Sequence, residues 1–192
     1  LGYIQFEQDD YEKALKTFEP LKESKIYQKI IPYYLAQIYF FKKEYTTLIS
    51  YLDEIKGQNK LKYRDELDQL AGQAYYEQKQ FEKALPYLEA YGQNKRSLRE
   101  ADVYQLGFAN YKTNKWQQAI AYLERLDNRE DSLGQNALYI LADCYMKEGN
   151  KNRLRERDIH KIVDVFRLQK TEAGFSRFVP NEEIRGNEYN LN

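Results

Sequence analysis

Hydrophobic positions along the chain recur with a period of about 35 residues. A leucine or alanine followed by a small residue returns at steps of 34, 36, 35 and 35 residues. Ten residues after each of the first four of these pairs there is an aromatic residue, and apolar residues follow it at helical spacing. A period of this length is typical of proteins built from repeated supersecondary units. The five repeats start at Leu1, Leu35, Ala71, Leu106 and Leu141.

Each repeat contains two segments with the periodicity of an amphipathic helix. Leu35 and Ile38 have the spacing of one helix, and Leu48 and Leu52 have that of a second helix. The polar stretch between them, such as "KKE", is too short for anything but an antiparallel turn. We therefore expect an all-helical chain, with helices near residues 31–43, 46–56, 65–78, 81–91, 100–113, 116–126 and 135–148.

The second position of every repeat is occupied by glycine or alanine. We expect two helices to cross closely there, because a larger side chain would overpack a tight contact. Pro86 lies about five residues inside a predicted helix, where proline removes a hydrogen bond and is expected to kink the helix. The small residues are Gly2, Ala36, Gly72, Gly107 and Ala142.

Four segments carry the same pattern: "LGYIQFEQDDYEKALKTFEPL", "LAQIYFFKKEYTTLISYLDEI", "AGQAYYEQKQFEKALPYLEAY" and "LGFANYKTNKWQQAIAYLERL". In period and in its helix–turn–helix unit, the pattern resembles the tetratricopeptide repeat. The resemblance implies an all-α fold, a right-handed superhelical α-solenoid of antiparallel helix pairs. The array is expected to cover residues 1–155, with units near 1–28, 29–64, 65–99, 100–134 and 135–155.

Both ends of the chain depart from the pattern. Leu1 already corresponds to the middle of a first helix, so we expect the natural protein to extend further upstream. Residues 156–192 form a degenerate C-terminal segment. For this segment three interpretations stay open: a capping helix followed by an irregular tail, a segment that folds on docking, and an arbitrary end left by excision from a longer chain.

The first helix of each repeat carries rings and amides on the side away from its packed face. Positions two before, two after and five after a repeat start point roughly 140–200° away from it on a helix. Stacked helix pairs place the first helices along a concave wall, and tyrosine supplies contact area at low entropic cost. We therefore predict a groove for a peptide or a partner helix. The predicted groove residues are Tyr33, Gln37, Phe40, Gln73, Tyr76, Tyr104, Phe108, Tyr111, Tyr139 and Asp143.

Some of these rings have a structural interpretation of equal weight. Phe40, Tyr76 and Tyr111 could instead pack between neighbouring first helices. We expect Tyr104 and Phe108 to contribute less to the stability of the fold than Phe40 or Tyr111. Replacing both with alanine should therefore leave the melting temperature nearly unchanged. One subset of the family grips a C-terminal carboxylate with lysine and asparagine on this wall. The tyrosine, glutamine and phenylalanine residues found here do not fit that mode.

The chain offers little catalytic chemistry. Lysine plus arginine and aspartate plus glutamate both number 30, so no field of one sign would attract nucleic acid. His160 is expected on a solvated surface, and Cys144 on the packed face, where a thiol is inert. The sequence contains no nucleotide-binding or catalytic motif, and no apolar run approaches the ~20 residues of a transmembrane helix. We predict no enzyme activity, no catalytic, cofactor or metal site, no nucleic-acid partner and no direct membrane insertion.

These observations favour a non-catalytic scaffold that binds a protein or peptide partner. The amino-acid composition, rich in Lys, Tyr, Asn and Gln, is similar to that of long repeat proteins of bacterial cell envelopes. That similarity implies a periplasmic or outer-membrane-associated location, while a cytoplasmic location stays open. The alternative is a docking or regulatory arm of a larger enzyme or signalling protein whose catalytic part lies outside this chain. The basic cluster from Lys151 to Arg157 is interpreted as a solvated helix face.

Overall fold

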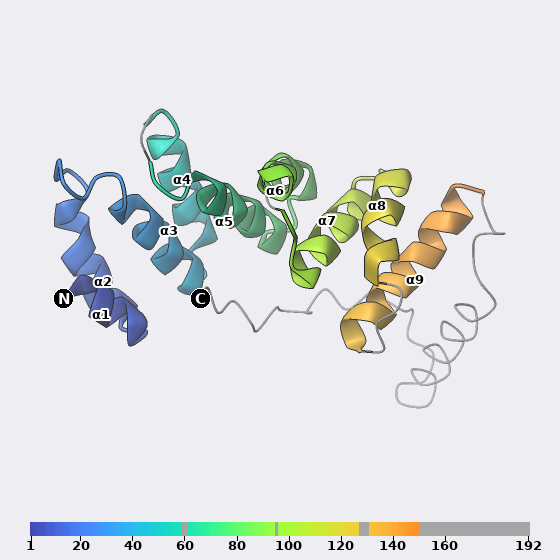
Figure 1. Cartoon of the computed structure of the whole chain (residues 1–192), viewed down its shortest axis with the longest axis horizontal. Coiled ribbons are helices and arrows are strands. Elements are labelled where there is room, and N and C mark those ends of the chain that lie inside the picture. The colour runs from blue at the N-terminus through green and yellow to red at the C-terminus, as the bar shows by residue number, and fades with distance from the viewer. Residues whose placement is uncertain (59–60, 95, 127–130, 150–192) are drawn as a thin grey trace. The chain divides into compact units, whose positions relative to one another are not determined.

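The computed structural model describes residues 1–58, 61–94, 96–126 and 131–149. Over these residues the chain forms nine α-helices and two 3₁₀ helices and no strand (Figure 1), which confirms the predicted all-α fold class. The chain divides into two compact units, Leu1–Arg96 and Ser97–Asn192. The predicted C-terminal segment 156–192, with His160 and the basic cluster, lies outside the described residues.

Three helix pairs make up the first unit. The two helices of each pair contact each other, and each pair contacts the next through α2 with α3 and through α4 with α5. The first helices α3 and α5 also contact one another. In chain order the helices are α1 (Gly2–Glu7), α2 (Tyr11–Phe18), η1 (Glu19–Leu21), α3 (Ile31–Phe41), α4 (Tyr45–Ile55), α5 (Arg64–Glu77) and α6 (Phe81–Asn94).

The described part of the second unit holds one complete pair and the first helix of another. Here α7 contacts α8, and α9 contacts both of them. The helices are α7 (Glu100–Lys112), α8 (Trp116–Leu123), η2 (Glu124–Leu126) and α9 (Ser132–Lys147).

All seven predicted helices are present, and their ends agree with the prediction to within three residues. The largest differences, of three residues each, are the start of α9 at Ser132, the end of α6 at Asn94 and the end of α8 at Leu123, which is followed by η2. Pro86 lies inside α6, and the helix continues on both sides of it. The periodicity of apolar residues therefore located the helices correctly.

The chain leaves the first helix of each of the five repeats through a residue in the same backbone conformation. This residue has a positive φ, between 58° and 71°. In the second repeat, the amide of Lys43 donates to the carbonyl of Phe40 at 2.8 Å, and the amide of Glu44 donates to the carbonyl of Tyr39 at 2.9 Å. This helix-ending arrangement normally favours glycine, because other residues are strained in the left-handed conformation. The five residues are Asp9, Lys43, Lys79, Asn114 and Gly149.

Aromatic rings pack across this turn in four successive repeats. The ring five residues after the repeat start contacts the ring that begins the second helix, an arrangement worth about 0.5–1.5 kcal/mol beyond the buried area. Phe40, Tyr76 and Tyr111 therefore have a structural role, but these ring partners lie on the second helix of the same pair. The centroid distances are 5.8 Å for Phe6–Tyr11, 5.6 Å for Phe40–Tyr45, 5.4 Å for Tyr76–Phe81 and 5.7 Å for Tyr111–Trp116.

The small residue at the second position of a repeat faces a core side chain sixteen residues later. A Cβ atom added at Gly72 would lie 2.7 Å from Cδ2 of Leu88, and one added at Gly2 would lie 2.6 Å from Cε1 of Phe18. The predicted close crossing of the two helices is thus confirmed. The second helices complete the core with small or aliphatic residues that are fully buried in four repeats, namely Ala14, Leu48, Ala84 and Ala119.

Tyrosine–carboxylate hydrogen bonds join consecutive pairs within each unit. The hydroxyl of Tyr39 on α3 donates to Oε1 of Glu19 in η1 at 3.0 Å. At the equivalent position of the second unit, Tyr145 on α9 donates to Glu124 in η2. These bonds join the first helix of one pair to the 3₁₀ helix that follows the second helix of the preceding pair.

Candidate functional site

The ten predicted groove residues all lie on the first helices of their repeats. Within the first unit α3 contacts α5, and within the second unit α7 contacts α9. The ten residues therefore fall into two groups, one in each unit, and each group lies on two helices that contact each other. The first group is Tyr33, Gln37 and Phe40 on α3 with Gln73 and Tyr76 on α5; the second is Tyr104, Phe108 and Tyr111 on α7 with Tyr139 and Asp143 on α9.

Two glutamines at the same position of successive repeats form the polar part of the first group. Gln37 is 3% exposed and Gln73 is 2% exposed. Within the described part of the chain, Oε1 of Gln37 and Nε2 of Gln73 have no hydrogen-bond partner. A buried amide atom without a partner has lost its hydrogen bonds to water and gained none in the protein, which destabilises the folded state by about 1–3 kcal/mol. The two atoms are an acceptor and a donor that a bound polar group could satisfy.

Tyr33 is a half-buried ring of the first group. Its centroid lies 4.6 Å from that of Tyr63 and 5.8 Å from that of Tyr34. Burial and then the carboxylate of Glu66 raise the pKa of Tyr33 to about 12, so its hydroxyl remains a donor at neutral pH. Phe40 is buried in this group.

Tyr104 and Phe108 are core residues of the second unit. They are 4% and 2% exposed, and their stacked centroids lie 5.9 Å apart. The expectation that these two rings are less structural than Phe40 or Tyr111 is therefore wrong. Helical geometry placed them opposite the packed face, but α7 is buried on every side from Asp102 to Asn110. Burial also raises the pKa of Tyr104, whose hydroxyl finds no hydrogen-bond partner among the residues that the structure describes.

Tyr111 and Asp143 meet in a polar cluster between α7 and α9. The hydroxyl of Tyr111 donates to Oδ2 of Asp143 at 2.7 Å, and Nζ of Lys147 lies 2.6 Å from the same oxygen. The Lys147 ammonium also lies 4.8 Å and 4.5 Å from the centroids of Tyr111 and Trp116, close enough for cation–π attraction. Sequence reasoning missed Lys147, although its position four residues after Asp143 on one helix was a usable signal.

Tyr139 lies at the edge of this cluster and is half-buried. Burial and then the Asp143 carboxylate raise the pKa of Tyr139. The pKa of Tyr111 is raised by the same two causes, to which its hydrogen bond to Asp143 is added. Both hydroxyls therefore remain protonated and can donate hydrogen bonds at neutral pH.

The described residues hold little that could support catalysis. None of their His, Cys, Asp and Glu side chains gather in a group suited to a metal ion. Cys144 is buried, and burial followed by the Asp143 carboxylate raises the pKa of its thiol to about 12. The reactive thiolate is therefore scarce at neutral pH. Over the same residues, every helix is too short or too polar to cross a membrane.

Solved structures with a similar fold are tetratricopeptide-repeat proteins. One is YrrB, described as a TPR protein with an unusual peptide-binding site; it is 16% identical over 89% of this chain and 84% of its own, with a TM-score of 0.67. MamA from Desulfovibrio magneticus RS-1 is 14% identical over 90% of this chain and 93% of its own, with a TM-score of 0.62. The family model for subunit 3 of the anaphase-promoting complex, or cyclosome, matches residues 63–126. The fold is that of tetratricopeptide-repeat proteins, as the sequence resemblance implied.

A second likeness concerns a different class of protein. The family model for N-6 DNA methylases matches residues 110–192. A stretch of 41 residues, 21% of this chain, is 58% identical to the methylase subunit of the type I restriction enzyme MjaVII from Methanocaldococcus jannaschii. The chain spans only 7% and 9% of the lengths of the two curated methylase subunits that it matches.

Proposed function

We propose that this chain is a non-catalytic scaffold that binds a peptide or a partner helix along the first helices of its repeats. The repeat fold supports this proposal, because repeats of this kind present extended surfaces for other chains. The description of YrrB as a peptide-binding repeat protein supports it as well. The balanced charge of 30 basic and 30 acidic residues favours a partner of mixed composition over a polyanion.

The unpaired amide atoms of Gln37 and Gln73 carry the proposal. They occur at equivalent positions on α3 and α5, two helices that contact each other. A peptide backbone offers one acceptor and one donor at every residue. Its carbonyl could accept from Nε2 of Gln73, and its N–H could donate to Oε1 of Gln37. Because both side chains are nearly covered, neighbouring side chains such as the half-buried Tyr33 must move when the peptide binds.

A displayed library of random peptides, selected on the immobilised 192-residue chain, tests the proposal. Dissociation constants of the enriched peptides are measured by fluorescence anisotropy. Gln73→Leu should weaken binding about tenfold, because the peptide loses a hydrogen bond in a buried site. The same change should leave the melting temperature equal or higher, since an unsatisfied buried amide is removed. Gln118→Leu, at an exposed position on α8, is the matched control.

The ring residues supply a second readout of the same site. Tyr33→Ala and Tyr139→Ala each remove a half-buried ring, one from each unit. Loss of an aromatic anchor costs about 2 kcal/mol, or some thirtyfold in affinity. If no peptide is enriched, or if all three variants bind as tightly as the unmodified chain, the first helices are not the binding surface.

The finer part of the proposal is a place in a larger protein associated with a bacterial envelope. Its support is the similarity in composition to long envelope repeat proteins. Cell fractionation with an antibody against this chain tests it. Recovery in the periplasm or with the outer membrane is expected, and recovery in the cytoplasm alone would contradict it.

The second candidate function is a docking arm of a larger enzyme, and the methylase likeness favours it. The matching stretch of 41 residues is too short to represent the whole of a methylase subunit of which it covers 7%. In this candidate, the repeats hold a partner while a catalytic part outside this chain transfers methyl groups. Both candidate functions assign binding, and no catalysis, to the 192 residues of this chain.

Methylation assays separate the two candidates. The purified chain and the full product of its gene are each incubated with duplex DNA and a labelled methyl donor. The docking arm predicts methylated adenine with the full product and none with this chain. No methylation by either favours the free-standing scaffold. Methyl transfer or tight DNA binding by this chain alone would contradict both candidates.

A further inference from the structure

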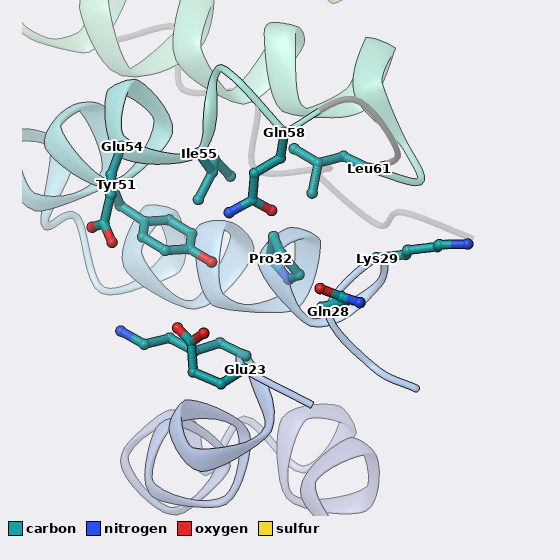
Figure 2. A pocket seen from close by; sticks show the side chains of 10 residues that line it. Glu23, Gln28, Lys29, Pro32, Tyr51, Glu54, Ile55, Gln58 and Leu61 are labelled. Atoms are coloured by element: carbon teal, nitrogen blue, oxygen red, sulfur yellow. The ribbon is translucent and has the colours of Figure 1, made fainter. Parts of the chain in front are cut away.

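A pocket of about 310 Å³ lies in the first unit, away from the ten predicted groove residues. Its wall combines the start of α3, the end of α4, residues of the segment 22–29, and the side chains of Gln58 and Leu61 (Figure 2). Pro32, Ile55 and Leu61 give it an apolar side. Its size falls at the lower end of the range for small-ligand pockets, about 300–1,000 Å³.

Tyr51 places a hydroxyl group in this pocket. The residue is only 8% exposed, and Figure 2 shows the hydroxyl pointing toward Pro32 and the amide of Gln58. The ring is held from behind by Tyr39, whose centroid is 5.7 Å away. Among the described residues nothing donates to this hydroxyl or accepts from it. The ring is buried, but the hydroxyl oxygen is not among the buried polar atoms without a partner, so it opens onto the pocket and is available to a bound polar group.

The charges around the hydroxyl are mainly negative. Glu23 and Glu54 line the pocket, and neither carboxylate has an ion-pair partner in the described part of the chain. Of the two lysines on the wall, Lys22 is paired with Glu19 at 3.3 Å, and Figure 2 shows Lys29 directed away from Tyr51. Burial, followed by the charges of neighbouring groups that include these carboxylates, raises the pKa of Tyr51.

Hydrogen bonds beside the pocket join described parts of the chain that line it or flank it. The amide of Lys62 donates to the carbonyl of Lys29 at 2.8 Å. The guanidinium of Arg64 donates to the carbonyls of Lys56 at 3.2 Å and Gln58 at 3.5 Å. These bonds link Lys29 and the end of α4, two described parts of the wall, to the start of α5, and such links lower the entropic cost of binding at those positions.

We propose that this pocket binds a cation on an aliphatic stem, as in an arginine or lysine side chain of a partner protein or in a free aliphatic amine. The methylene stem would lie against Pro32, Ile55 and Leu61, while the charged head remains at the polar end. There the Tyr51 hydroxyl oxygen and the carboxylates of Glu23 and Glu54 supply acceptors. Arginine, with five donors in a planar fork, suits this set of acceptors better than lysine.

Titrations of the isotopically labelled 192-residue chain, followed by NMR, test the proposal. The probes are N-acetylarginine amide, N-acetyllysine amide, agmatine and the neutral N-acetylcitrulline amide. The charged probes should shift amide signals near residues 28–32 and 51–58, with the citrulline compound binding at least tenfold more weakly. Tighter binding of acetylarginine amide than of agmatine identifies a protein side chain as the ligand, and the reverse identifies a free amine. Equal binding of citrulline and arginine compounds would overturn the proposal.

Two sets of variants locate the cation. Tyr51→Phe keeps the ring and removes the acceptor, and should weaken the arginine probe about tenfold. Glu23→Gln combined with Glu54→Gln should do the same, and both positions are exposed, so that the fold is preserved. Glu82→Gln, at an exposed position on α6, is the control. Unchanged binding in the double glutamine variant would overturn the proposal even if Tyr51→Phe failed to fold.

Discussion

Gly107 on α7 lies directly against Leu123 on α8, so closely that an added Cβ atom would be 2.6 Å from Cδ2 of the leucine. The same relation joins Gly72 to Leu88 at 2.7 Å, and the interval between the two residues is sixteen in both repeats. The side chain of Leu123 fills the space that a larger residue at position 107 would need. The helix crossing is thus a packing contact that the sequence repeats from unit to unit.

Gly107→Leu is expected to destabilise the fold by about 1–3 kcal/mol, because it overpacks this crossing. Chemical denaturation of both proteins measures the change in the free energy of unfolding. Gly57→Leu is the matched control: an added Cβ atom at position 57 has no other atom within 4 Å. Equal destabilisation by the two changes would show that the crossing is not the cause.

Lys43→Gly is expected to stabilise the fold by about 0.5–1 kcal/mol. Lys43 has a φ of 59°, a conformation that costs a side-chain-bearing residue about 1–2 kcal/mol and glycine almost nothing. Part of this gain is lost because glycine has more freedom in the unfolded chain. Lys43→Ala, which keeps a Cβ atom, should show no such gain in the same denaturation experiment.

Phe108→Ala is expected to cost about 3–5 kcal/mol, the usual effect of removing a fully buried aromatic ring. Tyr139→Ala on α9 removes a half-buried ring and should cost less than half as much. Thermal melting followed by circular dichroism compares the two variants. If Phe108→Ala melted like the unmodified chain, its 2% exposure would not reflect a packed core position.

The stability of the chain should fall as pH rises from about 10 to about 12. Burial, and then the hydrogen bond to Glu19, raise the pKa of Tyr39 to about 12, above the value near 10 of an unfolded tyrosine. The folded chain therefore keeps the proton longer, and its contribution to stability is complete below pH 10 and lost between the two values. Tyr39→Phe should flatten this decline in unfolding curves measured against pH. Tyr27→Phe, at an exposed ring, should leave it unchanged.

The thiol of Cys144 should be unreactive in the folded chain at neutral pH. It is the only cysteine, and burial raises its pKa to about 12, so both access and thiolate are lacking. A chromogenic thiol reagent should therefore react slowly with the native chain and rapidly with the denatured chain. Rapid reaction in the native state would mean that α9 opens readily.

The sequence alone determined the repeat, the helices and the close crossing. The reason is that helix periodicity and turn length are local properties, and a fivefold recurrence removes most of their ambiguity. Gly107 could be predicted as a packing residue because glycine or alanine occurs at that position in every repeat. The left-handed conformation of Lys43 could not be predicted, because lysine has no preference for a positive φ.

Only the tertiary structure decided which outward positions are exposed and where a pocket forms. Tyr104 and Tyr139 occupy equivalent positions in their repeats, yet the first is buried and the second half-buried. The burial of a side chain depends on which neighbouring helices cover it. The angular position of the residue around its own helix does not determine this. The pocket likewise joins Glu23, Pro32 and Tyr51, which no local pattern relates. Their proximity follows from the packing of α3 and α4 against the loops, a long-range property of the folded chain.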